Sequence, residues 1–195
     1  MRKIVSVGLI GLLTACAVSQ VNPLAVPLAY KSSATPLLPK TLSCPSISRI
    51  DVEDHRSEKV LGVRSHESKP LKADVTLASD PAPWLRDGMQ TFLARNGVTS
   101  TPNGARLLVD LSSLRTQESI WHRAGYDAKI GLTARVQSRS GKVCAEQPVE
   151  GKAGNYGYAG SIDNYQEMLS NALNDATQHL LDSPQFDTAL CQCAN

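Results

Sequence analysis

Two stretches of the chain show the apolar spacing of amphipathic helices. Residues 81–96 follow Asp80, a good N-cap, and precede Gly97, which suits a left-handed cap. A second apolar stripe follows Ser161 and ends before Pro184. The pattern therefore predicts two helices, with apolar positions Trp84, Leu85, Met89, Phe92 and Leu93 in the first and Ile162, Tyr165, Met168, Leu169, Leu173, Ala176, Leu180 and Leu181 in the second.

Most of the remaining domain alternates between apolar and polar residues, as strands with one covered face do. The clearest strand covers residues 126–136, and Ser140-Gly141 turns the chain into a partner strand that reaches about Lys152. Such one-sided alternation favours an antiparallel sheet. Further strands are predicted near residues 48–54, 60–63, 71–77 and 107–111.

These elements predict an α+β fold, a two-layer sandwich in which two amphipathic helices cover one face of a mainly antiparallel sheet. Residues 44–195 should form a single periplasmic domain with a cysteine-containing tail, because about 150 residues can bury one ordinary core. Only two Phe and two Trp are present, so Leu, Val, Ile and Ala must build most of that core.

Residues 16–43 are predicted to be a tether. They contain four prolines and show no helical or strand periodicity, and at about 3.1 Å per residue they could reach almost 80 Å. The alternating residues Leu24, Val26, Leu28 and Tyr30 make this segment more apolar than most linkers. Part of it is therefore a candidate to rest on the domain or on a partner.

The start of the chain has the three regions of a secretory signal peptide. Arg2 and Lys3 precede an apolar run of about ten residues, which is too short for a membrane span of roughly 20 residues. The sequence Leu-Thr-Ala before Cys16 resembles a bacterial lipoprotein signal. That resemblance implies removal of residues 1–15 and attachment of acyl chains, such as palmitate, to Cys16. The alternative is an ordinary cleaved signal that a cysteine happens to follow.

The lipoprotein resemblance also implies a location. Several acyl chains on Cys16 would exceed the two signals that stable anchoring needs, at about 0.8 kcal/mol for each buried CH₂. Lipoproteins with Asp after the cysteine are retained in the inner membrane, and here that residue is Ala17. We therefore expect a lipid-anchored protein of the outer membrane that faces the periplasm.

The charge balance argues against nucleic acid as a partner. Residues 1–15 hold two of the 20 basic residues and none of the 18 acidic residues, so the mature chain has no net charge. Proteins that bind nucleic acids usually carry a clustered basic surface.

The other four cysteines are predicted to form disulfides, because the signal directs the chain to an oxidising compartment. Cys191 and Cys193 are too close in sequence to pair with each other without strain, so each should pair with Cys44 or Cys144. The alternative is a metal site formed by Cys191, Cys193 and His179. That spacing matches no common zinc pattern, and we predict no metal.

The remaining candidates for chemistry are weak. Gly154, Gly157 and Gly160 could approach a phosphate, but no Lys-Ser/Thr pair follows them, and a bulged connection with exposed Tyr156 and Tyr158 is the better interpretation. His55, His66, His122 and His179 are scattered, and the group Asp51, Glu53, Asp54, His55 and Glu58 is typical of a solvated face. The sequence has no Gly-x-Ser-x-Gly elbow. We expect neither an enzyme nor a cofactor.

The two tryptophans have different interpretations. Trp84, on the first predicted helix, is expected in the core. Trp121, beside His122 and Arg123, is either a core residue or an exposed aromatic anchor of the kind enriched in interfaces. Core packing is the favoured interpretation.

The chain resembles the YajG-type outer-membrane lipoproteins over most of residues 1–186. The likeness lies in the lipoprotein signal, the proline-containing tether, Leu-Ala-Arg-Asn-Gly-Val at 93–98, Leu-Leu-Val-Asp-Leu at 107–111, the 126–136 strand and Val-Glu-Gly at 149–151 before the last helix. Cys44, Cys144 and the Cys-Gln-Cys tail depart from that pattern. The resemblance implies a location and a fold more than an activity.

Together these observations predict a non-enzymatic, lipid-anchored outer-membrane lipoprotein. Its periplasmic domain should bind an envelope partner through the edge or the open face of the sheet, in an accessory or assembly role. One alternative is a carrier that holds a lipid or glycan between helices and sheet. A periplasmic hydrolase is the third hypothesis, since catalytic groups can come together from distant positions.

Overall fold

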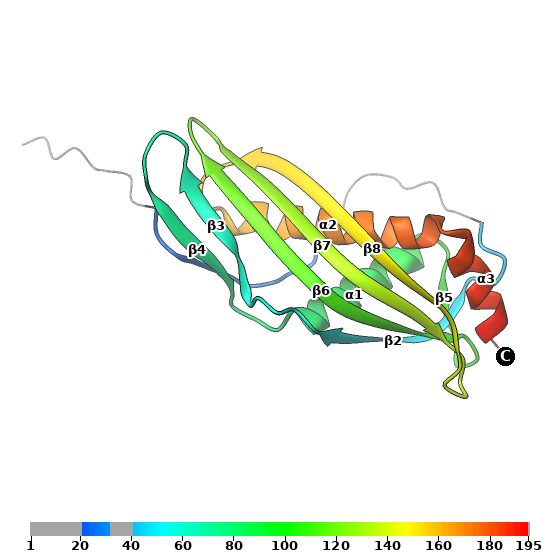
Figure 1. The fold of residues 1–195 in the computed structure, drawn as a ribbon. Coiled ribbons are helices and arrows are strands. Elements are labelled where there is room, and N and C mark those ends of the chain that lie inside the picture. The colour runs from blue at the N-terminus through cyan, green and yellow to red at the C-terminus, as the bar shows by residue number, and fades with distance from the viewer. Residues whose placement is uncertain (1–20, 32–40, 195) are drawn as a thin grey trace, which may run out of the picture.

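The computed structural model describes residues 21–31 and 41–194, and within them eight strands and three helices form one α+β unit (Figure 1). The predicted α+β class is confirmed. The strands are β1 (Leu24–Val26), β2 (Ser46–Asp54), β3 (Val60–His66), β4 (Lys72–Leu77), β5 (Thr99–Ser100), β6 (Ala105–Ile120), β7 (Ala124–Gln137) and β8 (Val143–Gly157). The helices are α1 (Pro81–Arg95), α2 (Ile162–Asp182) and α3 (Pro184–Cys193).

The sheet is organised around the long strand β6. On one side β6 pairs antiparallel with β7, which pairs antiparallel with β8. On the other side β2 and β3 lie end to end, each parallel to β6: β2 pairs with residues 105–111 and β3 with residues 116–120. The strands β5, β4 and β1 extend this side of the sheet.

The sheet is therefore mixed, and the predicted antiparallel pairing is found in only part of it: β3–β4, β6–β7 and β7–β8 are antiparallel. The pairings β1–β4, β2–β5, β2–β6 and β3–β6 are parallel. The alternating pattern identified a covered face correctly, but alternation does not determine strand direction. The direction follows from the connection, because the chain returns through α1 before it enters β6, and parallel pairing requires such a crossover.

The helices α1 and α2 lie on the same side of the sheet and contact each other (Figure 1). The predicted caps are present, since Asp80 accepts from the Ala82 amide at 3.0 Å and Ser161 accepts from the Asn164 amide at 3.3 Å. The helix α2 approaches β8 so closely that a Cβ on Gly151 would lie 2.0 Å from the Ala172 carbonyl oxygen. Glycine at position 151 thus permits this contact.

A third helix replaces part of the predicted tail. Pro184 ends α2 as expected, but it also occupies the first turn of α3, where its missing N–H costs nothing. The helix packs on the ends of β6, β7 and β8, and it buries Phe186, Ala189, Leu190 and Cys193. The prediction of only two helices was wrong because a proline can end one helix and begin the next.

Part of the predicted tether belongs to the sheet. Leu24, Ala25 and Val26 of β1 pair with β4, and Val26 is fully buried. The chain then crosses α2, where the Tyr30 hydroxyl donates to Asn174 Oδ1 at 2.8 Å. The alternating apolar residues of this segment therefore rest on the domain.

The strands β6 and β8 extend furthest beyond their predicted bounds. The register between β6 and β7 shifts between Leu111 and Ser113, and this bulge interrupts the alternation that would have predicted the second half of β6. At the other end, β8 continues to Gly157, so Gly154 and Gly157 lie in a strand. The phosphate-loop alternative is thereby contradicted.

Candidate functional site

Cys191 and Cys193 of α3 form disulfides, as predicted. Cys44 pairs with Cys191 and Cys144 pairs with Cys193, with Cα–Cα distances of 5.0 and 6.2 Å. These disulfides join α3 to the start of β2 and to β8, and we call this part of the molecule the disulfide end. Neither cysteine of the metal alternative is a free ligand. Cys16, Ala17 and the predicted signal lie outside the described residues.

Arg49, Asp51 and Glu53 of β2 lie on the face of the sheet that points away from α1 and α2, called here the outer face. His55 Nε2 lies 3.1 Å from a Glu53 carboxylate oxygen, and its Nδ1 lies 3.9 Å from Asp110. All three side chains face solvent at least in part, and neighbouring arginines neutralise most of the acids. The pairs are Arg49–Asp51 (2.9 Å), Arg106–Asp51 (2.5 Å), Arg135–Asp110 (2.7 Å) and Arg115–Glu58 (3.0 Å).

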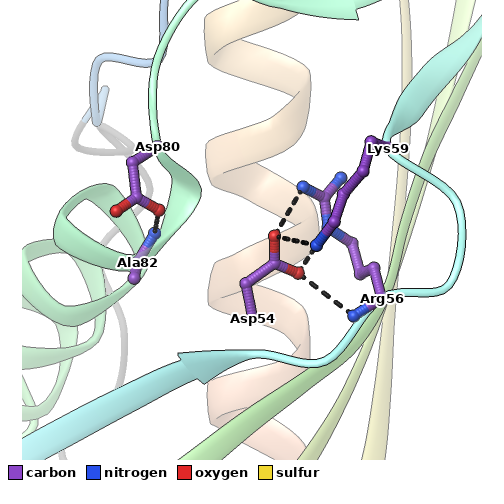
Figure 2. A network of polar contacts seen from close by, with 5 residues as sticks. All are labelled: Asp54, Arg56, Lys59, Asp80 and Ala82. Atoms are coloured by element: carbon purple, nitrogen blue, oxygen red, sulfur yellow. Dashed lines mark hydrogen bonds and ion pairs between the residues drawn. The ribbon is translucent and has the colours of Figure 1, made fainter.

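A separate ion-pair network forms the connection between β2 and β3 (Figure 2). Asp54 accepts from Arg56 Nε at 2.8 Å, from Arg56 Nη2 at 2.9 Å and from Lys59 Nζ at 2.9 Å. These hydrogen bonds, with that of Arg56 foremost, hold the pKa of Asp54 well below its usual range. The network fixes the turn that lets β2 and β3 lie end to end along β6.

The outer face has an apolar spot on β3, formed by Val60 and Val63. Val60 is 46 % exposed and Val63 is 37 % exposed, although both are large apolar residues in a strand. They line a hollow of about 400 Å³, and the charged residues Glu58, Lys72 and Arg115 surround it. An apolar centre within a charged rim is the usual anatomy of a protein interface.

A second exposed apolar group lies at the opposite end from the disulfides. Trp121, Tyr156 and Tyr158 are 61, 81 and 89 % exposed, and we call this group the aromatic end. The favoured prediction of a buried Trp121 was wrong, because Trp121 lies in the turn between β6 and β7. Trp84, in contrast, is buried in the core as predicted.

Two hollows of about 500 Å³ each are found at the aromatic end, and Trp121 and Tyr156 line both of them. The Tyr156 ring covers Gly125 on the outer face, where a Cβ would contact the ring at 3.4 Å. His122 stacks at a tilt on Trp121, with ring centroids 4.4 Å apart. The surface is thus hollowed and aromatic, and it carries the exposed charge of Arg123.

A buried polar cluster lies beneath the aromatic end. Glu118 is fully buried and accepts from Arg64 Nε at 2.5 Å, from the Gly160 amide at 2.6 Å and from the Tyr165 hydroxyl at 2.8 Å. Burial, and then the hydrogen bond to Glu118, raises the pKa of Tyr165 far above its usual value. The Tyr126 hydroxyl donates to the Tyr158 carbonyl. We call Glu118, Arg64, Tyr126 and Tyr165 the Glu118 cluster.

The Glu118 cluster was missed by the sequence analysis, which assigned Tyr165 only to the apolar stripe of a helix. One signal was available. Leu114, Thr116 and Glu118 occupy alternate positions of β6 and all face the helices. A carboxylate at a position that faces the covered side of the sheet needs a buried cation or hydrogen-bond donor as its partner. The sequence alone does not identify the partner residue.

The hollow between α1 and the sheet is small for a carrier. The hollow between α1 and β2, lined by Ile50, Leu93 and Val98 among others, measures about 230 Å³. Sites for small molecules usually occupy about 300–1,000 Å³, and a lipid chain needs an apolar channel of at least that size.

The free edge of the sheet at β8 is partly occupied by side chains of α2. The Lys152 amide donates to Asp175 Oδ2 at 2.9 Å, and His179 Nδ1 donates to the Glu150 carbonyl at 2.7 Å. Pro148 has no N–H to offer to another strand. These features hinder the addition of a partner strand at this edge.

The comparisons with known proteins give neither a family nor an activity. No protein-family model and no curated protein sequence matches the chain. A solved Xanthomonas campestris protein of family DUF330 has a TM-score of 0.48 and 11 % identity, covering 87 % of this chain and 94 % of that one. A putative lipoprotein from Caulobacter crescentus has a TM-score of 0.38 and 12 % identity, covering 54 % of this chain and 77 % of that one.

A minor lipoprotein from Acinetobacter baumannii has a TM-score of 0.35 and 14 % identity, covering 69 % of this chain and 94 % of that one. The resemblance to YajG-type lipoproteins stays a prediction at these values. In residues 21–31 and 41–194, we find no helix with the length and apolar character of a membrane span.

Proposed function

We propose that the protein is a non-enzymatic lipoprotein of the outer membrane, acylated at Cys16, whose periplasmic domain binds an envelope protein through the outer face of the sheet. The lipoprotein signal supports the anchor, and the exposed spot at Val60 and Val63 supports the binding role. Its place in the envelope is that of an accessory or assembly factor.

The observation that carries the binding role is the contrast within the outer face. Around β2 and β6 this face is covered by ion pairs, whereas at β3 two valines are exposed within a charged rim. Val63 lies in register with Gln117 of β6, and Gln117 with Asp127 of β7, so a polar row continues across the sheet from the apolar spot. A partner could bury the valines and pair with the rim.

A sheet edge was the other predicted surface, and the outer face is a better candidate than the edge at β8. The residues of α2 that bond to Glu150 and Lys152 occupy backbone groups that a partner strand would need. Binding through side chains on the outer face requires no such displacement.

The proposal is tested by site-specific crosslinking in cells. A photo-crosslinking residue at position 63 should give a discrete adduct with an envelope protein, and the same residue at Glu167, which is exposed on α2, should not. Equal adducts at both positions, or none at position 63, would contradict a specific surface. The mass of the N-terminal peptide from the same preparation shows whether Cys16 carries acyl chains.

A further inference from the structure

The described chain enters the fold beside the aromatic end. The carbonyl of Asn22 accepts from Arg64 Nη1 at 2.9 Å, and Arg64 lies in register with Glu118 of β6. Trp121 follows Glu118 by three residues, at roughly 3.3 Å per residue along a strand. The point where Asn22 is bound therefore lies about 10 Å from Trp121 along the direction of β6. In Figure 1 the start of β1 and the turns β3–β4 and β6–β7 lie at the same end of the molecule.

The distance to the predicted anchor is short. Asn22 is the sixth residue after Cys16, and a fully extended chain of six residues reaches about 20 Å. The strand β7, which connects the aromatic end to the disulfide end, has 14 residues and is about 45 Å long. An acylated Cys16 can therefore reach past Trp121, but it cannot reach the level of the disulfides.

We propose that the aromatic end docks on the headgroup region of the phospholipid bilayer that holds the acyl chains of Cys16. This inference rests on the acylation stated under the proposed function, and it adds the orientation of the domain. The disulfide end then points into the periplasm, and the outer face stands upright from the membrane, where a partner can approach it.

The side chains of this end suit a bilayer interface. Tryptophan and tyrosine are enriched at the headgroup level, because each combines an apolar ring with one polar group. Trp121, Tyr156 and Tyr158 come from the β6–β7 turn, the end of β8 and the connection to α2, so they form a surface and not a single protruding loop. Exposure of three large aromatic side chains to water is otherwise unfavourable.

The charges around the rings match lipid headgroups. Arg123 is exposed next to Trp121 and can bond to phosphate oxygens, while Glu67, which lines one of the hollows, can face ammonium groups. The hollows of about 500 Å³ beside Trp121 and Tyr156 are open to solvent and have the scale of a small ligand or headgroup. A soluble glycan could also stack on the rings, and the test below separates the two.

The aromatic end is also fixed to the fold. Gly160 donates to Glu118 and Tyr126 donates to the Tyr158 carbonyl, so the connection that carries Tyr158 is bonded to the buried cluster. The same Glu118 cluster binds the chain at Asn22 through Arg64. The entry of the tether and the aromatic surface thus form one rigid unit, and less orientational freedom is lost on docking.

The test uses the acylated mature chain, purified and placed in vesicles of phosphatidylethanolamine and phosphatidylglycerol whose acyl chains carry bromine near the headgroup. Bromine quenches tryptophan on contact, and the chain has only two tryptophans, of which Trp84 is buried. We expect a blue shift and loss of the Trp121 emission, obtained as the difference between the wild-type protein and Trp121→Phe.

The matched control moves the reporter to the other end. Val143 is exposed near the β7–β8 turn, so the double variant W121F/V143W carries its exposed tryptophan at the disulfide end. We expect no quenching of that emission. Equal urea unfolding midpoints for the three proteins verify that each is folded.

Each other outcome overturns the inference in a distinguishable way. An acylated protein whose Trp121 emission is unquenched refutes the docking but leaves the anchor intact, and equal quenching in W121F/V143W refutes the orientation. If the N-terminal peptide has no acyl chains, the anchor of the proposed function fails and the inference fails with it. If soluble muropeptides shift Trp121 emission saturably and brominated lipid does not quench it, the surface binds glycan instead.

Discussion

The two ends of the sheet are stabilised by different means. At the disulfide end, two covalent bonds connect α3 to distant parts of the chain. At the aromatic end, the connection is made by the buried hydrogen bonds of Glu118 to Arg64, Gly160 and Tyr165. The disulfides restrict the unfolded chain, whereas the Glu118 cluster acts in the folded state and fixes the orientation of particular groups.

The largest effect on stability is expected from the disulfide end. In the chain-entropy model, removal of Cys44–Cys191, with a separation of 147 residues, costs about 5 kcal/mol of unfolding free energy. Removal of Cys144–Cys193, with a separation of 49, costs about 4 kcal/mol in the same model. Urea unfolding of C44S/C191S and C144S/C193S measures both. An unchanged midpoint in either double variant would show that its disulfide does not form.

A slightly smaller but more local effect is expected at the aromatic end. The substitution Glu118→Ala leaves Arg64 buried without its carboxylate, which typically costs about 3–5 kcal/mol. Hydrogen exchange should show faster exchange at the Gly160 amide than at amides of α3. The double variant R64M/E118L should recover part of the stability, because no unpaired charge remains. If it is as unstable as Glu118→Ala, the unpaired charge is not the cause.

The smallest effect is expected between the ends, at the turn from β2 to β3. Asp54→Asn weakens charged hydrogen bonds at a largely covered site and should cost about 1–2 kcal/mol. Since the pKa of Asp54 is lowered in the folded state, its contribution is present above the ordinary pKa and is lost as the pH falls below it. Asp54→Asn should therefore reduce the loss of stability between pH 7 and pH 3.

The matched control for Asp54 is Asp163, which pairs with Lys31 on an exposed surface. Urea midpoints of Asp163→Asn should equal those of the wild-type protein at both pH values, because exposed pairs contribute little. A similar change in both variants would assign the effect of Asp54 to net charge and not to its network.

Local signals predicted the parts of the fold that depend on local interactions. The caps Asp80 and Ser161 marked the starts of α1 and α2 correctly, and the turn at Ser140-Gly141 joined β7 to β8 as expected. These features involve residues only a few positions apart, so a sequence pattern contains all the groups concerned.

The features that were missed depend on distant partners. The sequence between residues 112 and 120 contains a bulge and a buried carboxylate, so its pattern resembles that of an exposed turn. Only the folded structure shows that Arg64 and Tyr165 bind the Glu118 carboxylate and allow its burial. The pairing of β1 with β4 joins residues about 50 positions apart. Exposure of Trp121 likewise depends on where the β6–β7 turn lies relative to the helices.

The helix α3 has a consequence for oxidative folding. Four cysteines allow three pairings, and two of these connect residues 191 and 193 to the other two cysteines in different ways. In an α-helix, residues two positions apart are rotated by about 200° around the helix axis, so their side chains point to nearly opposite sides. Once α3 forms, it directs Cys191 toward Cys44 and Cys193 toward β8, so a short helix selects the native disulfide partners.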